Sequence, residues 1–438
     1  MTAQHAEPTA DRAPVPAPWT GQWVTDRLGI RLTGSPELPE LIGLALRENK
    51  KRAHLLVSHV LGKHIPQLPV VVHGAGLELG RRVRELLGAA DADRAVVLGY
   101  AETATALGHS VADGLGAPYL HSTRRPVDGV SPVGGFEEEH SHATSHLLLP
   151  EDPEFLAGDG PLVLVDDEFS TGTTVLNTIR ALHADHPRPH YVVVALVDLR
   201  TDADRERLAK AAAELGARVD LIATAVGGVE LPADVLAQAQ ELIAAAEPAP
   251  ALPDGPLAPV ARTGAAWPDG LPDGGRHGFT ADHRARLEAA LPEQAAELAE
   301  LLSGRRRVLV LGFEELMYAP LRLAGALAEV LGEDRVRFST TTRSPVLAVD
   351  HPGYAIRTRL AFPAHDDPAD GSTDRFAYNV APGADPARRF DAVVLVVDAL
   401  GDTPSLHEGE QALLQQLRRV TDQVVLAVLP SYRPRFPR

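Results

Sequence analysis

The sequence contains no cysteine, few aromatic residues and no apolar run long enough to span a membrane. The lack of cysteine excludes a disulfide framework and a cysteine-ligated metal site. No run approaches the roughly 20 apolar residues of a spanning helix, and the N-terminus lacks the apolar core of a signal peptide. We therefore expect a cytoplasmic protein with no membrane partner. Lysine is also scarce, since three of only four lysines lie within residues 50–63.

What is present indicates a globular protein of several domains. The 438 residues suffice for two or three domains, and 45% hydrophobic with 23% charged residues are typical of soluble chains. A net charge of −17 argues against a surface that coats nucleic acid. Composition divides the chain into a disordered tail, a first domain, a linker rich in Pro, Gly and Ala, and a second domain. The expected bounds are 1–18, 19–246, 247–275 and 276–438.

The most informative stretch is residues 162–174. Leu162 to Val165 form an apolar run, the pattern of a strand buried in a parallel sheet. Asp166 and Asp167 follow, and a loop of small and hydroxylic residues then opens a helix. Such a loop presents backbone N–H groups and the positive end of a helix dipole, which suit a phosphate. The adjacent carboxylates can accept hydrogen bonds from two vicinal hydroxyls or help to hold Mg²⁺, so the pattern indicates a ribose 5-phosphate site.

This stretch resembles the phosphoribosyl pyrophosphate signature of the type I phosphoribosyltransferases, with four apolar, two acidic and seven mostly small residues. Its one departure is the bulky pair that starts the loop, and the alternative is an ordinary strand–turn–helix crossover. The resemblance implies a magnesium-dependent enzyme in which Asp166 and Asp167 hold the ribose hydroxyls, act in catalysis and contact the metal indirectly. The expected 5-phosphate loop is Glu168, Phe169, Ser170, Thr171, Gly172, Thr173 and Thr174.

A second turn, after the apolar run at 95–98, occupies the place of the pyrophosphate loop in the resembled family. Backbone N–H groups at a helix start again suit an anion. Glu102 is unexpected beside a polyanion, and it either holds Mg²⁺ or caps its own helix. Two arginines after the strand at 119–120 suit pyrophosphate, because guanidinium binds phosphate in a bidentate way; the alternative is a plain basic turn. The expected pyrophosphate residues are Gly99, Tyr100, Ala101, Glu102, Thr103, Arg124 and Arg125.

Residues 127–150 show no good helix or strand pattern, and a loop of this length is functional or disordered. In the resembled enzymes the equivalent segment is a mobile cover that often carries a catalytic lysine or histidine. No lysine is present here, so His140 and His142 are the expected catalytic residues. Two alternatives stay open: the Glu/His cluster binds a transition metal, or the segment is a solvated tether.

Basic residues concentrate near the N-terminus. They form either a solvated helix face or a site that contacts phosphate, and Lys63 and His64 are the better candidates for phosphate contact. The expected elements of the first domain are a strand-like segment at 19–32, a helix at 38–46, a second segment at 51–61, a strand at 70–72, a helix at 78–87, strands at 191–197 and 219–226, and helices at 204–215 and 232–246. This alternation predicts a parallel sheet.

The second half repeats the first. The turn at 310–315 compares with that at 97–102, and the segment at 339–346 compares with 122–127. A buried strand at 392–397 ends in Asp398, but the acidic pair and the Gly-Thr-Thr loop are missing. An irregular polar stretch at 362–379 takes the place of the cover. We expect an α/β protein in which a parallel-sheet phosphoribosyltransferase fold is followed by a degenerate copy, which does not hold ribose 5-phosphate in the same way. Chance likeness of two α/β folds is the alternative.

The Thr-Arg-Ser-Pro element at 342–345 resembles the C-terminal TRSP domain, which is fused to phosphoribosyltransferases encoded near tellurite-resistance and stress-response genes. The resemblance implies an enzyme that ribosylates an unknown nitrogenous or similar acceptor from phosphoribosyl pyrophosphate, with pyrophosphate released and a nucleotide-like metabolite formed. A regulatory protein that senses phosphoribosyl pyrophosphate and an interaction scaffold stay open, and the sequence allows a homodimer. The candidates for an acceptor or second-domain site are Lys63, His64, Arg343, His365, Arg375 and Tyr378.

Overall fold

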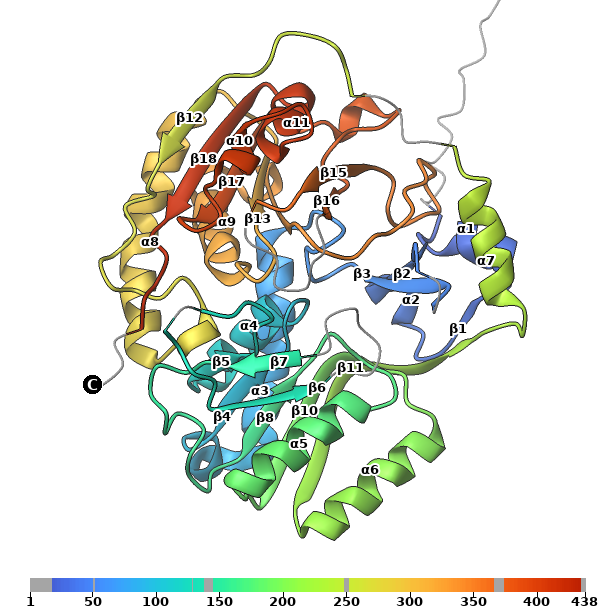
Figure 1. Cartoon of the computed structure of the whole chain (residues 1–438), viewed down its shortest axis with the longest axis vertical. Helices are drawn as coiled ribbons and strands as arrows, with labels where there is room; N and C mark the ends of the chain where they lie inside the picture. Colours follow the sequence, from blue (N-terminus) through green and yellow to red (C-terminus); the bar gives the residue numbers. More distant parts are fainter. Residues whose placement is uncertain are drawn as a thin grey trace, which may run out of the picture.

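The computed structural model describes residues 18–49, 52–127, 129–137, 145–247, 252–365 and 374–434. These residues build two sheets with helices around them, one in each half of the chain (Figure 1). Within these ranges, no helix combines the length and the apolar character that crossing a membrane requires.

The first sheet has seven strands in the order β1-β11-β10-β8-β4-β5, with β9 beside β10. All neighbours are parallel except the edge pair β1 and β11. The central strand β8 is buried throughout, as its apolar run predicts. The strands are β1 (Arg31–Gly34), β4 (Val96–Gly99), β5 (Tyr119–His121), β8 (Leu162–Val165), β9 (Glu168–Phe169), β10 (His190–Asp198) and β11 (Arg218–Glu230).

Helices cover both faces of this sheet. Side chains alternate along a strand, so Val163 and Val165 pack toward one layer while Leu162 and Leu164 pack toward the other. The first layer is α3 (Pro69–Ala92) and α4 (Thr105–Leu115), and the second is α5 (Thr173–Asp185) and α6 (Asp202–Leu215). The first sheet therefore has the two covered faces expected of a parallel α/β fold.

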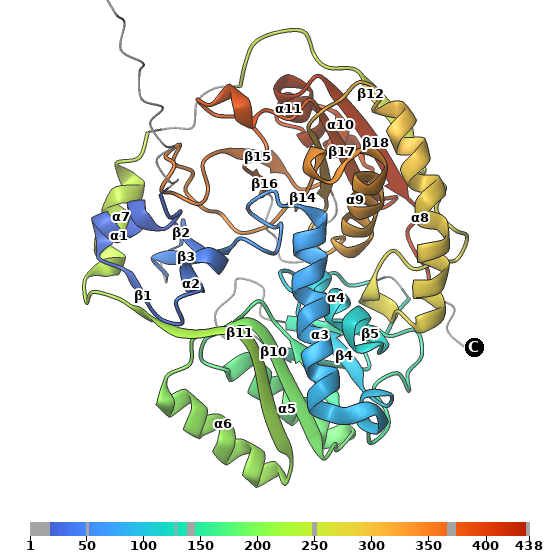
Figure 2. The same cartoon turned by 180° about the vertical axis from the view of Figure 1, so that it is seen from behind.

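The second sheet is parallel throughout, in the order β12-β18-β17-β13-β14. Its strands are β12 (Val260–Thr263), β13 (Val308–Gly312), β14 (Val336–Thr340), β17 (Ala392–Asp398) and β18 (Gln423–Leu429), and its helices are α8 (Ala281–Leu301), α9 (Tyr318–Leu331), α10 (Pro404–His407) and α11 (Leu413–Val420). Strand β12 comes from the segment predicted as a linker. One apolar core runs from α3 and α4 to α8 and α9 and joins the halves; Figure 2 shows α3 extending from the first sheet toward α9.

Two pairs of backbone hydrogen bonds cross between the halves. Gln67, which precedes α3, exchanges N–H···O bonds of 3.0 and 2.8 Å with Phe338 in β14. Phe279, which precedes α8, exchanges bonds of 2.9 and 2.7 Å with Tyr119 in β5. Each half therefore extends the edge strand of the other.

A third core forms where the N-terminus and α7 meet the second half. Its buried residues include Val24, Leu44, Val235 and Tyr354. The elements outside the two sheets and their covering helices are α1 (Gln22–Leu28), α2 (Leu38–Leu41), β2 (Ile42–Leu46), β3 (His54–Ser58), β6 (Gly134–Glu137), β7 (Ser145–Leu148), α7 (Val235–Ala244), β15 (Arg359–Pro363), β16 (Asp374–Tyr378) and the short helices η1 (Gly275–His277), η2 (Glu333–Arg335) and η3 (Pro386–Arg388).

The strand expected at 70–72 is wrong, because these residues form the start of α3, and the helix expected next is part of the same element. Pro69 opens α3, and proline suits the first helical position because the N–H that it lacks would be unpaired there. Val72, Leu79 and Val83 are buried in the core shared with α4. Tertiary packing thus overrides the strand preference of the β-branched residues.

The N-terminal elements also differ from expectation. The helix expected at 38–46 is a single turn, α2, followed by β2, and the segment at 51–61 contains β3. The strand-like segment at 19–32 contains α1 before β1 begins. An apolar run such as Ile42–Leu46 suits a buried strand and a buried helix equally, and here antiparallel pairing with β3 decides.

The two stretches expected to be irregular contain antiparallel hairpins. Strands β6 and β7 lie in the segment 127–150, and β15 and β16 occupy the two ends of the stretch 362–379. Thr123, after β5, and Thr342, after β14, each pair with the second strand of the following hairpin. The two hairpins therefore join their sheets in the same way.

Candidate functional site

The turn after β8 places two carboxylates and a small-residue loop at the carboxyl edge of the first sheet. Asp166 accepts a 2.9 Å bond from the Asp167 backbone N–H, which fixes the Asp166 side chain against the backbone of the turn. Gly172 has φ 78°, in the left-handed region that favours glycine, and α5 starts at the next residue. Arg207 of α6 donates to the Thr171 carbonyl at 2.9 Å and holds the loop.

The bulky pair at the start of this loop is an anchor. Phe169 is buried in the core beneath the loop, and the Arg200 guanidinium lies 4.4 Å from its ring centroid. Glu168 and Phe169 form β9, which pairs with the end of β10. The departure from the resembled signature thus fastens the loop to the sheet.

A second loop, residues 99–103, lies at the same edge between β4 and α4. The Ala101 N–H donates to Ser122 Oγ at 3.0 Å, and the Ser122 N–H donates to the Gly99 carbonyl at 3.0 Å. The peptide bond from Ala101 to Glu102 is cis. These bonds link the loop to the segment after β5 that carries Arg124.

Glu102 forms ion pairs with cations from both halves of the chain. Lys63 Nζ lies 2.9 Å from Glu102 Oε1 and donates to Thr103 Oγ1 at 2.8 Å. Arg343 Nε lies 3.8 Å from Glu102 Oε2. Burial raises the pKa of Glu102, but Lys63 and Arg343 outweigh burial and hold this pKa below its ordinary value. Helix α4 begins without a side-chain cap, so the carboxylate serves the cations.

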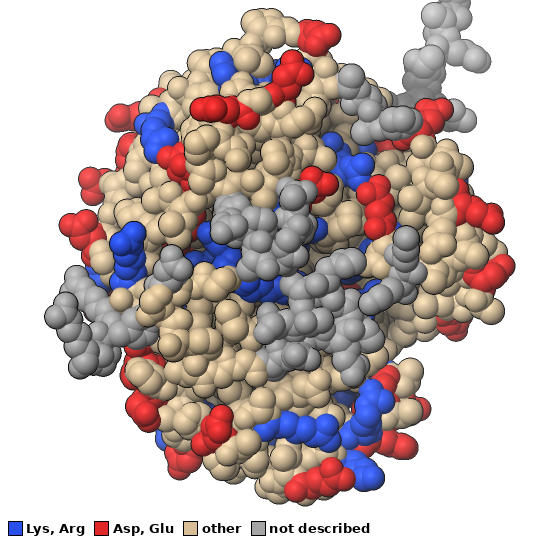
Figure 3. Space-filling view, viewed as in Figure 1, with Lys and Arg blue, Asp and Glu red and all other residues tan. Residues whose placement is uncertain are grey.

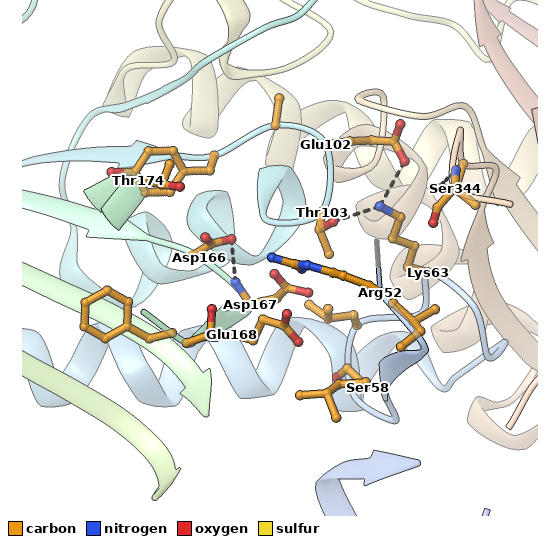
Figure 4. A pocket seen from close by; sticks show the side chains of 18 of the residues that line it. Arg52, Ser58, Lys63, Glu102, Thr103, Asp166, Asp167, Glu168, Thr174 and Ser344 are labelled. Atoms are coloured by element: carbon orange, nitrogen blue, oxygen red, sulfur yellow. Dashed lines mark hydrogen bonds and ion pairs between the residues drawn. The ribbon is translucent and has the colours of Figure 1, made fainter. Parts of the chain in front are cut away.

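Both loops open onto one cavity of about 620 Å³. Figure 3 shows Lys and Arg side chains in the hollow between the halves, and Figure 4 shows Asp166, Asp167, Lys63, Glu102 and Ser344 around one space. The sequence-predicted residues that line it are Lys63, His64, residues 100–103, Arg124, residues 166–174 and Arg343.

Other predicted residues lie outside this lining. Gly99 ends β4, and the Arg125 guanidinium lies 3.9 Å from Asp398 of the second sheet. His365 Nδ1 hydrogen-bonds the Gly401 carbonyl at 2.6 Å, also in the second half. His140 and His142 lie outside the described residues.

Arg375 and Tyr378 support the Thr-Arg-Ser-Pro segment instead of lining the cavity. Tyr378 donates to the Ser344 carbonyl at 2.7 Å and accepts from the Val346 N–H at 2.8 Å. Glu314 pairs with the buried Arg375 and with Arg343. This network fixes the direction in which Arg343 enters the cavity.

Sequence reasoning did not select several residues of the site. The β2–β3 hairpin lines the cavity with Arg47, Asn49, Arg52, Leu55, Leu56 and Ser58, and Ser344 and Pro345 line it from the second half. The concentration of basic residues near Arg47 and Arg52 was the available signal. No signal indicated that a hairpin would carry them.

Glu315 is a further missed residue, and it clamps the halves together. Its carboxylate accepts from Thr123 Oγ1 at 2.7 Å and from the Arg124 N–H at 3.0 Å, and it pairs with Arg276 at 3.2 Å. Burial raises the pKa of Glu315, but Arg276 and His121 outweigh burial and hold it well below the usual range. Its side chain therefore stays ionised at neutral pH.

The donor set fits Mg²⁺, which takes oxygen ligands and usually binds through one or two carboxylates plus substrate phosphates. Asp166 and Asp167 both line the cavity (Figure 4). Among the described residues, no group of three or more His, Asp or Glu side chains is assembled as a metal site. Asp166 and Asp167 could therefore hold Mg²⁺ together with water and substrate oxygens.

Two family models match the chain. One, described as a phosphoribosyl transferase, covers residues 41–228, and the other, the TRSP domain C-terminal to that transferase, covers 273–417. This chain is a phosphoribosyltransferase-family protein with a C-terminal TRSP domain. The family resemblance and the α/β fold class expected from the sequence are confirmed. A comparison with curated proteins gives no match.

Solved phosphoribosyltransferase structures align with about two fifths of this chain. The Giardia lamblia APRTase complexed with 9-deazaadenine is 18% identical, covering 42% of this chain and 93% of that one, with a TM-score of 0.31. The Trypanosoma brucei adenine phosphoribosyl transferase is 14% identical over 43% and 80%, with a TM-score of 0.32. The Aeropyrum pernix orotate phosphoribosyltransferase is 23% identical over 42% and 88%, with a TM-score of 0.26. Scores this low carry no argument about the substrate of this chain.

Proposed function

We propose that this protein is a magnesium-dependent phosphoribosyltransferase that transfers ribose 5-phosphate from phosphoribosyl pyrophosphate to a nitrogenous acceptor. The observation that carries the proposal is the convergence of two loops, 99–103 and 166–174, on one cavity. One loop combines a helix N-terminus with paired carboxylates, which suits a phosphate and a diol. The other lies beside Lys63 and Arg343, which suit a second, more highly charged group.

The residues would divide the substrate between them. The loop at 170–174 would bind the 5-phosphate, and Asp166 and Asp167 would accept hydrogen bonds from the ribose hydroxyls. Lys63, Arg124 and Arg343 would hold pyrophosphate, so the TRSP domain completes the site. The chemistry that Mg²⁺ supplies when bound at the carboxylates is neutralisation of charge on the pyrophosphate.

In the proposed step, the bond between ribose C1 and the pyrophosphate oxygen breaks, and its electron pair leaves with pyrophosphate. A nitrogen lone pair of the acceptor forms the new bond to C1, and the proton that this nitrogen loses passes to water. Positive charge develops on the sugar and negative charge on the leaving group. Cations fixed beside the leaving group lower this barrier because they need no reorganisation during the step.

The test is pyrophosphate release by the full chain with phosphoribosyl pyrophosphate, Mg²⁺ and a panel of nitrogenous acceptors. We expect release with at least one acceptor, and its loss in the double variant Asp166→Asn/Asp167→Asn. Activity that survives this double substitution would refute the site. Tight binding of phosphoribosyl pyrophosphate without release on any acceptor would instead make the protein a sensor. A nucleotide-like product linked to tellurite or stress resistance is proposed from the TRSP resemblance alone.

A further inference from the structure

We propose that His146 is a positioning residue of the pyrophosphate site, and that it ties the Arg124 guanidinium to the loop at 99–103. The proposal rests on the proposed function and adds a residue to the same cavity. His146 lies in β7, is only 1% exposed, and lines the cavity together with Arg124. Sequence reasoning chose other histidines of the same segment.

Each ring nitrogen of His146 has a polar contact. Nδ1 lies 2.9 Å from Ser122 Oγ, and Nε2 lies 3.5 Å from a terminal nitrogen of Arg124, the outer limit for a hydrogen bond. A guanidinium group can only donate, so Nε2 must be the acceptor and must carry no proton. The proton of the neutral imidazole then lies on Nδ1, which donates to Ser122 Oγ. These contacts assign the Nδ1–H tautomer to His146.

Ser122 connects this imidazole to the loop at 99–103. Its Oγ also accepts from the Ala101 N–H at 3.0 Å. With the Nδ1–H of His146 as the second donor, both lone pairs of the hydroxyl oxygen are used. A chain of hydrogen bonds therefore runs from the loop through Ser122 and His146 to the guanidinium of Arg124.

The backbone on both sides of this chain of bonds is held in place. Thr123 and Leu147 exchange N–H···O bonds of 2.9 Å, so β7 is fixed against the segment that carries Arg124. The Arg124 N–H donates to Glu315 of the second half at 3.0 Å. With both backbones held, the imidazole limits where the guanidinium end of Arg124 can lie. A cation that is already in place loses less entropy when it binds an anion.

A related arrangement is found beside Arg343 in the second half. Thr342, which precedes Arg343, forms a backbone bridge with β16 as Thr123 does with β7. One residue before each bridged position, β16 has Arg375 where β7 has His146. Both arginines of the cavity therefore have a polar side chain of the following hairpin at the equivalent place.

The two copies differ in what joins these side chains. Glu314 pairs with Arg343 and with Arg375, and so holds the first of them. Ala101 takes the place of Glu314, because each lies two residues after the glycine that ends β4 or β13. The side chain of Ala101 accepts no hydrogen bond, and in the first half an acceptor for the arginine comes from His146 itself. An arginine of the cavity is thus oriented by a carboxylate in one half and by an imidazole in the other.

Two substitutions separate the two nitrogens of the ring. Asparagine can replace the bond to Ser122, but its side chain is too short to reach Arg124. We expect His146→Asn to raise the KM for phosphoribosyl pyrophosphate about tenfold and to change kcat less than about threefold, because the guanidinium must then be ordered during binding. Glutamine carries an acceptor near the place of Nε2, so His146→Gln should keep this KM within about threefold of the unmodified chain.

The deciding experiment is a double-mutant cycle on the full chain. Binding of phosphoribosyl pyrophosphate with Mg²⁺ is measured by isothermal titration for His146→Asn, Arg124→Gln and the two combined. If the imidazole acts through Arg124, the combined variant should bind no more weakly than Arg124→Gln alone, because nothing is left to position. Losses of affinity that multiply in the combined variant would overturn the proposal.

The control is a histidine that is hydrogen-bonded outside the cavity. His183 Nδ1 lies 2.9 Å from the Tyr191 hydroxyl, and His183→Asn should leave the affinity within about twofold. A fall in unfolding free energy in His146→Asn with affinity unchanged would make His146 structural and contradict the proposal. Failure of the unmodified chain to bind phosphoribosyl pyrophosphate would instead remove the proposed function itself.

The tautomer gives a test that needs no ligand. Long-range ¹H–¹⁵N NMR spectra of the histidine-labelled full chain, with His146→Gln to assign the signal, should show the Nδ1–H form of His146 at neutral pH. An Nε2–H form or an imidazolium signal would overturn the assignment, because neither can accept from Arg124.

Discussion

The two halves of the chain share one plan, but only the first has the acidic pair and the small-residue loop that we propose to bind ribose 5-phosphate. The strand order β10-β8-β4-β5 of the first sheet reappears as β18-β17-β13-β14 in the second, with all strands parallel. A helix follows β4 and β13, and a hairpin is inserted after β5 and after β14. The order and direction of eight strands agree, which is strong support for the duplication that the sequence suggested.

The agreement extends to single hydrogen bonds. In the first half the Ala101 N–H donates to Ser122 Oγ at 3.0 Å. In the second, the Glu314 N–H donates to Thr341 Oγ1 at 3.1 Å, and the Thr341 N–H donates to the Gly312 carbonyl at 3.1 Å. The turn that shapes the proposed pyrophosphate loop is therefore present twice.

The halves also contact each other reciprocally. Glu102 of the first half pairs with Arg343 of the second, while Glu315 of the second half accepts from the backbone of Arg124 in the first. Lys63, in a Gly-Lys-His turn before α3, and Arg276, in a Gly-Arg-His turn before α8, pair with the same two glutamates. The contacts between the halves are thus alike, whereas the loop proposed to bind phosphate differs between them.

The divergence is local. Leu164 in β8 and Leu395 in β17 occupy equivalent positions in the two sheets. Each pairs with the residue just before the glycine that ends the neighbouring strand, β4 or β13. Counting from them, Asp398 takes the place of Asp167, and Val397 that of Asp166. Asp398 accepts from the Gly401 N–H at 2.9 Å, a bond within its own turn. Asp398 thus stabilises its own turn, and it is not among the residues that line the cavity of about 620 Å³.

The largest expected effect comes from exchanging the matched aspartates. Asp167→Asn should lower pyrophosphate release at least about 100-fold, because it removes charge beside the reacting sugar. Asp398→Asn should leave kcat/KM within about threefold and lower the free energy of unfolding by about 1 kcal/mol, because it weakens the turn. Steady-state kinetics and urea unfolding of both variants check this. Equal losses of activity would mean that the second half takes part in catalysis.

A second effect is expected where the copies differ in the shared core. Asp113 binds His73 at 3.0 Å, Arg284 at 2.5 Å and Tyr318 at 2.7 Å. The equivalent residue of the second half, which lies as far after Gly312 as Asp113 lies after Gly99, is Ala326. Asp113→Asn should cost about 2 kcal/mol at pH 7, because the partner cation would stay buried without its counter-ion. Urea unfolding measures this cost.

The pH dependence of that cost follows from the pKa of Asp113. Burial raises this pKa, but His73, His109 and Arg284 outweigh burial and lower it to about 2. The folded-state pKa lies below the unfolded value, so the stabilisation is complete above about pH 4 and is lost as pH falls toward 2. The difference between the unmodified chain and Asp113→Asn should shrink across this window. A difference that stays constant down to pH 2.5 would contradict the account.

Glu315→Gln should have a smaller effect on catalysis, from outside the cavity. It weakens the bonds to Thr123 and Arg124, so the proposed pyrophosphate cation is less well positioned. We expect kcat/KM to fall about tenfold, mainly through KM for phosphoribosyl pyrophosphate. The exposed Glu78→Gln serves as the control. A fall in unfolding free energy with KM unchanged would reduce Glu315 to a structural role.

The smallest effect is expected at two glycines with positive φ. Gly172→Ala introduces a Cβ at φ 78°, with Phe169 Cζ 3.1 Å away, and should cost about 1 kcal/mol and weaken phosphoribosyl pyrophosphate about threefold. Gly409 in the second half has φ 90° with open space around its Cβ. Gly409→Ala should lower stability similarly and leave the affinity unchanged. Isothermal titration of both variants makes the comparison, and an equal loss of affinity in both would count against the phosphate loop.

The sequence was most informative where one local signal had one meaning. The run from Leu162 to Thr174 combines a buried strand, two carboxylates and a small-residue loop, and each part occurs where it was predicted. The prediction of a strand at Val70–Val72 was wrong because the local strand preference competed with packing of α3 on α4, which only the folded core reveals. The hairpin that carries Arg47 and Arg52 was not predicted for a similar reason, because its apolar runs suit a strand and a helix equally.

Contacts between the halves were beyond sequence reasoning for another reason. Glu102 looked misplaced beside a polyanion because its partner Arg343 lies far along the chain. Glu315 had no sequence signal of its own, although the repeated turn made it the equivalent of Glu102. A duplicated pattern therefore predicts two similar units, but the residues through which those units touch emerge only when both are folded together.

The crossed edge strands have a consequence for how the molecule comes apart. Gln67 and Phe279 each bind to a strand of the opposite half, so neither half has a complete sheet edge by itself. A protease cut in the connection before β12 would thus leave two fragments that stay associated, elute as one particle and melt in one transition. In this respect the chain resembles a dimer whose subunits happen to share a single backbone.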